Sequence, residues 1–483
     1  MAKKILIIDD DILVIKSLSK YLKTYGYLIE TALNSQEAID KSEKTNFDLI
    51  ISDVRMPGMD GIETLKTIRD FSIQNKKEKT PAIIITGYAG DKIYEHLGEL
   101  GITGYIYKPF DLDQFIEIVN KNLISPPKYE GEITVDFNLV DKGFISITND
   151  MSIFLDDIKR KLDEFDKTIS DEKEQINFIE LNKQIIFSKL DNYFEKAWGY
   201  VEALEKDKYI LYQKYFQKFL HPLLEEGVQI NSHIYRKPLG YPGDYIMMNY
   251  IYDYNNNNRY LGKTSYEKLI NNYTCNIPAS CSNISRKDFL KEKILESLNL
   301  NIKTEILSLA CGPARELIEL LKEGKINKPL KFKFLDFEKK TLDFIKTEID
   351  KTNNEKKCFM DVEFICRDLT SIIRDKKLKE ELRGSNLIYA FGIFDYLSNR
   401  MASRLSKELY ELLAKNGKLI ICNISTSDIS HRAYYELLGE WNMVHRSQEE
   451  MLSWLEGIVD NAKINFEQPK NPCNYLFLTI QKL

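Results

Sequence analysis

The first residues whose types and spacing suggest chemistry are carboxylates that follow apolar runs. Asp9 and Asp10 come directly after residues 4–8, and Asp53 follows residues 49–52. Such runs predict buried strands of a parallel sheet, and the carboxyl ends of these strands meet at one edge. Crowded carboxylates there repel one another and offer hard oxygen ligands, so they indicate a Mg²⁺ site.

Two further strands should end at the same edge. Residues 83–86 deliver Thr86, and residues 104–107 deliver Lys108. A carboxylate nucleophile that forms an acyl phosphate needs a metal ion and a nearby cation to neutralise the incoming oxygens. The acidic cluster and Lys108 supply both, which favours phosphoryl transfer to a carboxylate.

With the motifs 53–61 (Asp-Val-Arg-Met-Pro-Gly-Met-Asp-Gly) and 108–110 (Lys-Pro-Phe), residues 1–124 resemble the receiver domain of bacterial response regulators. The resemblance implies a flavodoxin-like five-stranded parallel sheet, a sensor histidine kinase as partner, and a cytoplasmic protein. It also implies site roles: Asp53 as phosphoacceptor, Mg²⁺ on Asp9, Asp10, Asp53 and the Arg55 carbonyl, Lys108 on the phosphoryl group, and Thr86 with Tyr105 as switch pair. The alternative is a receiver that only dimerises.

A second candidate site begins where the apolar run 306–309 breaks into small residues. Ala310, Gly312 and Ala314 predict a tight turn, and the helix that follows presents free N–H groups to a ligand. The strand 332–336 ends at Asp336 about 20 residues further on, the spacing at which an acid reaches ribose hydroxyls in nucleotide-binding folds. The simpler alternative is an ordinary strand–turn–helix unit.

Strands at 362–367, 386–391 and 417–423 continue an alternation of strands and helices. With this alternation the region resembles a class I S-adenosylmethionine-dependent methyltransferase, although Ser308 stands where that family commonly has an acid. The resemblance implies a Rossmann-like domain with a mostly parallel sheet and a cofactor pocket formed by Ala310, Gly312, Ala314, Asp336, Asp368, Phe391 and Gly392. In this pocket Asp336 would hold the ribose and Asp368 would lie near the adenine.

The middle of the chain reads as helical. Apolar residues recur at spacings of four, three and seven between Met151 and Ile179, which predicts either a coiled-coil heptad or an amphipathic helix packed inside its own chain. Further helices are expected at 182–205 and 208–224, where the aromatic residues fit core packing. Pro242-Gly243 then predicts a type II turn that exposes Asp244 between Tyr241 and Tyr245.

Residues 237–245, 391–397, Asn423 and Trp441 together resemble a methyltransferase family associated with the biosynthesis of an extracellular factor, 3-hydroxypalmitic acid methyl ester. A carboxylate acceptor would need no general base, whereas a hydroxyl acceptor would need one. Candidate bases follow the fourth and fifth strands. The substrate and cap candidates are Tyr241, Asp244, Tyr245, Asp395, Tyr396, His431 and Glu436.

Composition limits the remaining classes of function. The net charge of −5 and the absence of a basic block disfavour nucleic-acid binding, and no run is long and apolar enough to span a membrane. Seven cysteines without a Cys-x-x-Cys pair fit free thiols in the cytoplasm. The expected divisions are a receiver (1–124), a linker and helical segment (125–230), a helical cap (231–300) and a methyltransferase domain (301–483).

The sequence therefore predicts a response regulator in which phosphorylation of Asp53 controls a C-terminal S-adenosylmethionine-dependent methyltransferase. The expected acceptor is a carboxylate or hydroxyl of a small or lipid-like molecule, and a homodimer is a candidate assembly. Two alternatives stay open. The C-terminal domain could bind the cofactor as a non-catalytic scaffold, or it could methylate protein carboxylates.

Overall fold

The chain forms two compact units in the computed structural model, Met1–Asp136 with Arg236–Tyr241, and Phe137–Tyr235 with Pro242–Leu483. The structure describes residues 3–86 except 55, 57, 76 and 78, followed by 102–107, 112–124, 137–254, 258–300, 303–355, 360–426, 431–458, 462–467, 469 and 473–483. Each unit has its own sheet and its own hydrophobic core.

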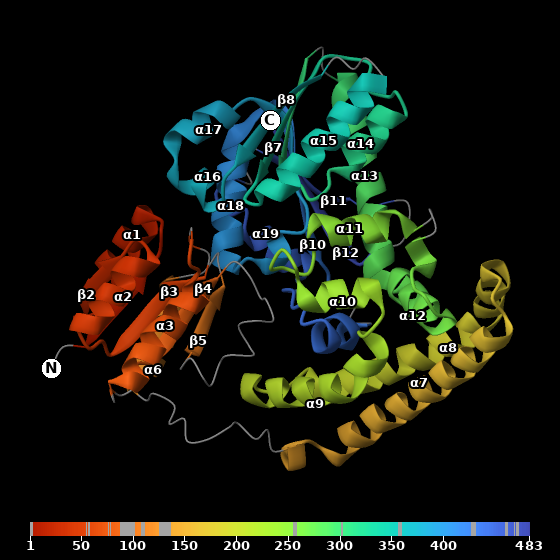
Figure 1. The fold of residues 1–483 in the computed structure, drawn as a ribbon. Coiled ribbons are helices and arrows are strands. Elements are labelled where there is room, and N and C mark those ends of the chain that lie inside the picture. The colour runs from red at the N-terminus through yellow and green to blue at the C-terminus, as the bar shows by residue number, and fades with distance from the viewer. Residues whose placement is uncertain are drawn as a thin grey trace. The chain divides into compact units, whose positions relative to one another are not determined.

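The sheet of the first unit has five parallel strands in the order β2-β1-β3-β4-β5 (Figure 1). Buried aliphatic side chains fill the space on both faces of the sheet, which explains why the strands read as continuous apolar runs. This confirms the predicted receiver-like sheet. Its elements are β1 (Lys4–Ile8), α1 (Ile12–Lys23), β2 (Leu28–Ala32), α2 (Ser35–Lys44), β3 (Leu49–Asp53), α3 (Gly61–Gln74), β4 (Ala82–Thr86), β5 (Ile102–Tyr107) and α6 (Leu112–Ile124).

The sheet of the second unit has seven strands in the order β11-β12-β10-β9-β6-β7-β8. The run β8-β7-β6-β9-β10 is parallel, and β12 pairs antiparallel with both β10 and β11. The strands are β6 (Thr304–Leu309), β7 (Leu330–Asp336), β8 (Met360–Cys366), β9 (Ser385–Ala390), β10 (Leu413–Ile424), β11 (Ala462–Glu467) and β12 (Tyr475–Lys482). The expected mostly parallel α/β sheet is present.

Helices cover both faces of this sheet, and each face has a separate core (Figure 1). One face packs against α13 (Pro278–Leu300), α14 (Arg315–Lys322) and α15 (Lys339–Glu355). The other packs against α16 (Thr370–Arg374), α17 (Lys376–Leu382), α18 (Asn399–Leu412) and α19 (Gln448–Ser453). Strands buried on both faces again explain their apolar sequences.

The helices of the middle segment belong to the second unit. They are α7 (Lys142–Thr168), α8 (Glu172–Val201), α9 (Lys206–Leu224), α10 (Gln229–Arg236), α11 (Tyr245–Tyr252) and α12 (Ser265–Asn276). Met151, Leu155 and Ile179 are buried with residues of α9 and α12 in one core. The heptad residues therefore pack inside their own chain, as the second of the two predicted readings requires. This core also extends across residue 230, where a boundary was expected.

A short π-helix, η5 (Ala433–Leu438), is held by a row of side chains on α9. Gln213, Gln217 and His221 lie one turn apart and donate to the carbonyls of Glu436, Leu437 and Leu438 at 2.7, 2.9 and 2.9 Å. The last carbonyls of a helix lack donors within the helix, and α9 supplies donors to these groups from outside. This row fixes the segment after β10 against the helical core.

We expect Gln217→Leu to destabilise the second unit by about 1–3 kcal/mol, because it leaves the Leu437 carbonyl buried without this donor. Trp198, Trp441 and Trp454 all lie in the second unit, so urea unfolding followed by tryptophan fluorescence reports on it. Lys214→Met, at an exposed position of α9, is the matched control. Equal midpoints for the two variants would contradict the role given to this row.

Candidate functional site

The acidic cluster of the first unit lies at the carboxyl edge of its sheet. Asp9 and Asp10 follow β1, and Asp53 ends β3 beside it. One carboxylate oxygen from each of the three residues lies within 4.8 Å of the others. Asp9 and Asp53 are buried, whereas Asp10 is exposed. Three oxygens this close fit one divalent cation, which would offset their mutual repulsion.

Gly61 sets the backbone around Asp53, and the sequence reading did not single it out. A Cβ at this position would lie 1.9 Å from the Asp53 carbonyl oxygen, and the Gly61 N–H donates to the Val54 carbonyl at 2.9 Å. Only glycine allows the start of α3 to approach the end of β3 so closely. The Asp60-Gly61 pair of the motif was the available signal, since Asp60 caps α3.

Several predicted receiver residues lie partly or wholly outside the described residues. Lys108 and Arg55 lie outside the described residues. Thr86 ends β4 and Tyr105 lies in β5, and the backbones of these strands pair, but the side chains of both residues fall outside the described part. The proposed phosphoryl contact and switch pair therefore stay predictions.

In the sheet of the second unit, the order in which the chain adds its parallel strands reverses at one point, the topological switch point. The chain runs outward from β6 to β7 and β8, then crosses back to β9 on the other side of β6. The five parallel strands thus keep the doubly wound order 3-2-1-4-5. In such sheets ligands bind in the crevice at this switch point, which here lies between the ends of β6 and β9.

The turn after β6 has an unusual backbone. Ala310 and Ala314 both have positive φ angles, 48° and 47°, as does Gly312 at 50°. For alanine this left-handed conformation carries a cost, and such outliers gather at ligand sites. A Cβ at Gly312 would meet no atom within 4 Å, so the backbone is open there. Ala314 caps α14 without a side-chain acceptor, and the Leu317 N–H donates to the Ala314 carbonyl at 3.1 Å.

Asp336 is brought to this turn, as predicted. It ends β7, and its carboxylate accepts from the Cys311 thiol at 3.6 Å and from the Glu338 N–H at 2.9 Å. Burial raises the pKa of Asp336 to about 6. Asp336 is therefore a desolvated acid beside the open turn, in a position to accept from ligand hydroxyls.

The other predicted cofactor residues lie on neighbouring strand ends. Asp368 follows β8, and its carboxylate accepts from the Thr370 N–H at 2.7 Å. Phe391 and Gly392 follow β9, with Phe391 packed against Phe477 and Gly392 at a φ of 80°. They share the carboxyl edge with Asp336, and direct contact with a ligand stays a prediction for each.

Asp395 and Tyr396 follow β9, and each forms a hydrogen bond with a residue at or after the end of β10. Asp395 is 1% exposed, and its carboxylate accepts from the Ile424 N–H at 2.7 Å. Burial raises the pKa of Asp395 to about 6. The Trp441 indole N–H donates to the Tyr396 hydroxyl at 2.6 Å, and the Trp441 ring covers Gly243, where a Cβ would lie 2.9 Å from the ring. The Pro-Gly turn and the segment after β10 are thus joined.

The prediction that Asp244 is exposed is wrong. Asp244 is fully buried, caps α11 by accepting from the N–H groups of Ile246 and Met247, and accepts from His233 Nε2 at 2.8 Å. These bonds satisfy its carboxylate inside the fold, so Asp244 holds the start of α11. The adjacent Tyr245 packs its ring against Phe344 at 4.8 Å. Tyr241 falls in the short segment of the first unit.

His431 and Glu436 are engaged by the helical part of the second unit. His431 Nε2 lies 2.8 Å from an Asp191 carboxylate oxygen, and Glu436 accepts from Arg432 Nε at 2.8 Å. Their described partners are thus on α8 and at the residue that precedes the π-helix. A role for either residue as general base stays a prediction.

Two residues of the site were missed by the sequence reading. Glu316 in α14 is buried and accepts from the Tyr389 hydroxyl at 2.6 Å. Arg286 in α13 is 7% exposed and lies next to Gly392. Glu316 lies in the helix that follows the turn, and Arg286 lies in a helix outside the motif, so neither belongs to a recognisable spacing.

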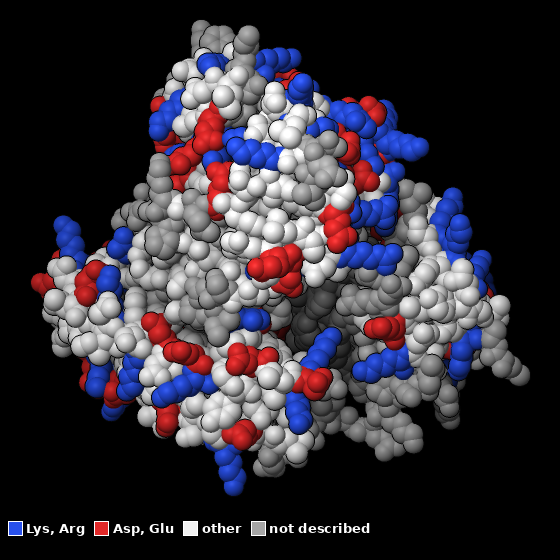
Figure 2. Space-filling model, turned by 180° about the vertical axis from the view of Figure 1, so that it is seen from behind, with Lys and Arg blue, Asp and Glu red and all other residues white. Residues whose placement is uncertain are grey.

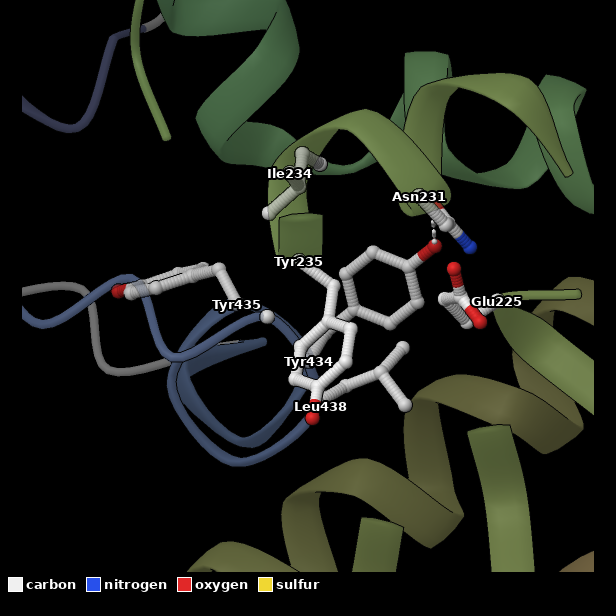
Figure 3. A pocket seen from close by; sticks show the side chains of 8 residues that line it. Glu225, Asn231, Ile234, Tyr235, Tyr434, Tyr435 and Leu438 are labelled. Carbon is white, nitrogen blue, oxygen red and sulfur yellow. Dashed lines mark hydrogen bonds between the residues drawn. The ribbon is translucent and has the colours of Figure 1, made fainter. Parts of the chain in front are cut away.

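A small cavity beside the π-helix provides little room for a ligand. Tyr434 points into it and donates to Asn231 at 2.9 Å, while Glu225 and Leu438 line its wall (Figure 3). Its volume of about 10 Å³ holds roughly a single water molecule. This cavity is therefore too small for an organic ligand.

Charged side chains on the face shown in Figure 2 alternate in sign over the described surface, without an extended basic area. This distribution fits the net charge of −5. Among the described residues, no helix combines the length and the apolar character needed to cross a membrane.

We expect Asp395→Asn to become more stable relative to the wild type as pH rises. Because the folded-state pKa is raised to about 6, the acid contributes stability below about pH 4 that is lost as pH rises through 6. The difference in unfolding free energy should therefore shift by up to about 3 kcal/mol in favour of the variant between pH 4 and 7. Urea unfolding followed by tryptophan fluorescence checks this, and a difference that does not depend on pH would contradict it.

Comparison with known proteins identifies the first unit. The response regulator receiver domain matches residues 5–120. The chain is 35% identical over 123 residues to sporulation initiation phosphotransferase F of Bacillus subtilis and covers 95% of that protein. It is 36% identical over 126 residues to the probable transcriptional regulator ycf29 of Porphyra purpurea.

Each of these two matches covers 26% of this chain. The chain spans 57% of the length of the Porphyra regulator. A solved response regulator, TrrA from Thermotoga maritima, is 34% identical, with 25% of this chain and 97% of that chain covered and a TM-score of 0.21. Through its first unit, the chain belongs to the response regulator receiver family.

Proposed function

We propose that this protein is a two-component response regulator whose second unit is an S-adenosylmethionine-dependent methyltransferase controlled by phosphorylation of Asp53. The observation that carries the enzymatic half is the left-handed turn 310–314 at the switch point, with the buried carboxylate of Asp336 beside it. The acidic cluster carries the regulatory half.

The receiver half follows from the chemistry of the family. Receiver domains bind Mg²⁺ at their acidic site and are phosphorylated by sensor histidine kinases. In this chain Asp9, Asp10 and Asp53 would hold the ion, and Asp53 would accept the phosphoryl group. The metal would neutralise the approach of phosphoryl oxygens to a carboxylate nucleophile.

We expect Asp53→Asn to abolish Mg²⁺-dependent labelling by radioactive acetyl phosphate, because the amide cannot form an acyl phosphate. Asp40→Asn, at an exposed position of α2, is the matched control and should label like the wild type. Labelling of Asp53→Asn at the wild-type level would place the phosphoacceptor elsewhere.

The second unit fits an adenosine-containing cofactor. The open backbone at Gly312 and the uncapped start of α14 suit close approach of a polar ligand, and Asp336 can accept from ribose hydroxyls. Ser308 lacks the acid that the methyltransferase pattern has at this point. The fit therefore rests on Asp336 and the turn.

Methyl transfer from a sulfonium is an in-line displacement that depends mainly on alignment and on exclusion of water. Tyr396, which follows β9, and Trp441 are joined by a hydrogen bond and supply an aromatic cover there. Asp395, with a pKa of about 6, is poised to take a proton from a hydroxyl acceptor. A carboxylate acceptor would need no base.

We expect Asp336→Ala to weaken binding of S-adenosylhomocysteine by about 1.5–3 kcal/mol, measured by calorimetry. Wild-type affinity should rise between pH 5 and 7, because hydroxyl donors favour the ionised form of an acid whose pKa is about 6. The variant should lack this pH dependence. Asp350→Ala, at an exposed position of α15, is the control, and equal affinity of Asp336→Ala and the control would refute the assignment.

A non-catalytic cofactor-binding output is the second candidate, favoured by Ser308 at the position of the usual acid. Incubation with methyl-labelled S-adenosylmethionine and a fractionated lysate separates the two. Label in a lipid, a small acid or a protein supports the enzyme and names its acceptor class. Cofactor binding without transfer in any fraction supports the scaffold.

A further inference from the structure

Arg286 is a buried cation beside the switch point. It lies in α13, is 7% exposed, and its guanidinium stacks over the Tyr475 ring at 4.9 Å. Tyr252 and Cys422 are its other close neighbours. Burial raises the pKa of Tyr252 to about 12 and raises that of the Cys422 thiol, so both groups are neutral near pH 7.

The other cations of the same helix have carboxylate partners. Lys287 and Lys291 bind Glu319 at 2.7 and 2.8 Å, and Lys293 binds Glu467 at 2.5 Å. Among the described residues, by contrast, no carboxylate oxygen lies within 4.0 Å of Arg286. A buried cation without a carboxylate in direct contact is costly, and Arg286 is as deeply buried as Lys287, at 7% and 8% exposed.

Gly392 lies beside the guanidinium of Arg286. A Cβ at Gly392 would lie 3.5 Å from Arg286 Nη1, and the φ of 80° at this glycine disfavours any other residue. Gly392 follows β9 directly, so this side of the guanidinium lies next to the carboxyl end of β9, beside the switch point. The Tyr475 ring packs against the guanidinium, whose planar fork suits two parallel hydrogen bonds to a planar anion.

We propose that Arg286 binds a carboxylate of the molecule that occupies the switch-point crevice. Asp395 and Glu316 both lie close enough to interact electrostatically with Arg286, and these acids disfavour a doubly charged phosphate more than a singly charged carboxylate. The inference rests on the proposed function. The carboxylate belongs either to the amino-acid part of the cofactor or to the methyl acceptor.

The test compares ligands with and without a carboxylate, using full-length wild-type protein, Arg286→Met and Arg286→Lys. S-adenosylhomocysteine carries the cofactor carboxylate, whereas 5′-methylthioadenosine keeps the nucleoside and lacks it. Octanoate and octanol, titrated in the presence of S-adenosylhomocysteine, probe the acceptor side. Arg432→Met is the matched control, because Arg432 also stacks on a ring, Trp198 at 4.3 Å, but has Glu436 as partner.

If Arg286 holds the cofactor, Arg286→Met weakens S-adenosylhomocysteine roughly 10- to 100-fold and leaves 5′-methylthioadenosine unchanged. If it holds the acceptor, both nucleosides bind as in wild type and the preference for octanoate over octanol is lost. Arg286→Lys should recover part of either effect, and Arg432→Met should show neither.

Two results overturn the inference while leaving the proposed function intact. One is unchanged binding of every ligand by Arg286→Met, and the other is an equal loss for ligands with and without a carboxylate. Failure of the wild type to bind either nucleoside would instead refute the proposed function itself, and the inference with it.

Discussion

The second unit depends on a backbone constraint at the end of β6. Two alanines and a glycine take left-handed conformations within five residues, and they do so where the chain turns from the sheet into α14. The turn is held by the pairing of β6 between β7 and β9 and by the Ala310 N–H, which donates to the Leu335 carbonyl at 2.9 Å. The neighbouring strand ends then deliver Asp336, Gly392 and Asp395 around it.

Both units place acids at the carboxyl edge of a parallel sheet. The acids are clustered in the first unit and separated in the second. In the first unit three carboxylates gather within 4.8 Å, an arrangement that favours a bound cation. In the second unit single buried acids lie apart, and burial raises the pKa of both Asp336 and Asp395 to about 6. The first edge suits metal-assisted phosphoryl chemistry, and the second suits recognition of hydroxyl groups and proton transfer.

Much of the fold could be predicted because strand runs and strand-end acids are local signals. The runs before Asp9, Asp53 and Asp336 are strands, and each acid lies at the expected edge. Asp244 was misjudged because its burial depends on His233 and on the start of α11, neither of which its own turn reveals. Arg286 was missed for a related reason, since only tertiary packing brings α13 to the strand ends. Local spacing carries no record of such long-range contacts.

The most direct test of a phosphorylation-controlled enzyme is the affinity and turnover of the full-length protein with and without beryllofluoride and Mg²⁺. A ligand shifts an equilibrium only by its differential affinity for two states, so the expected change in S-adenosylhomocysteine affinity or methyl transfer is roughly 5- to 150-fold. Asp53→Asn should not respond. Identical affinity, turnover and molecular mass in both conditions for the wild type would contradict the account.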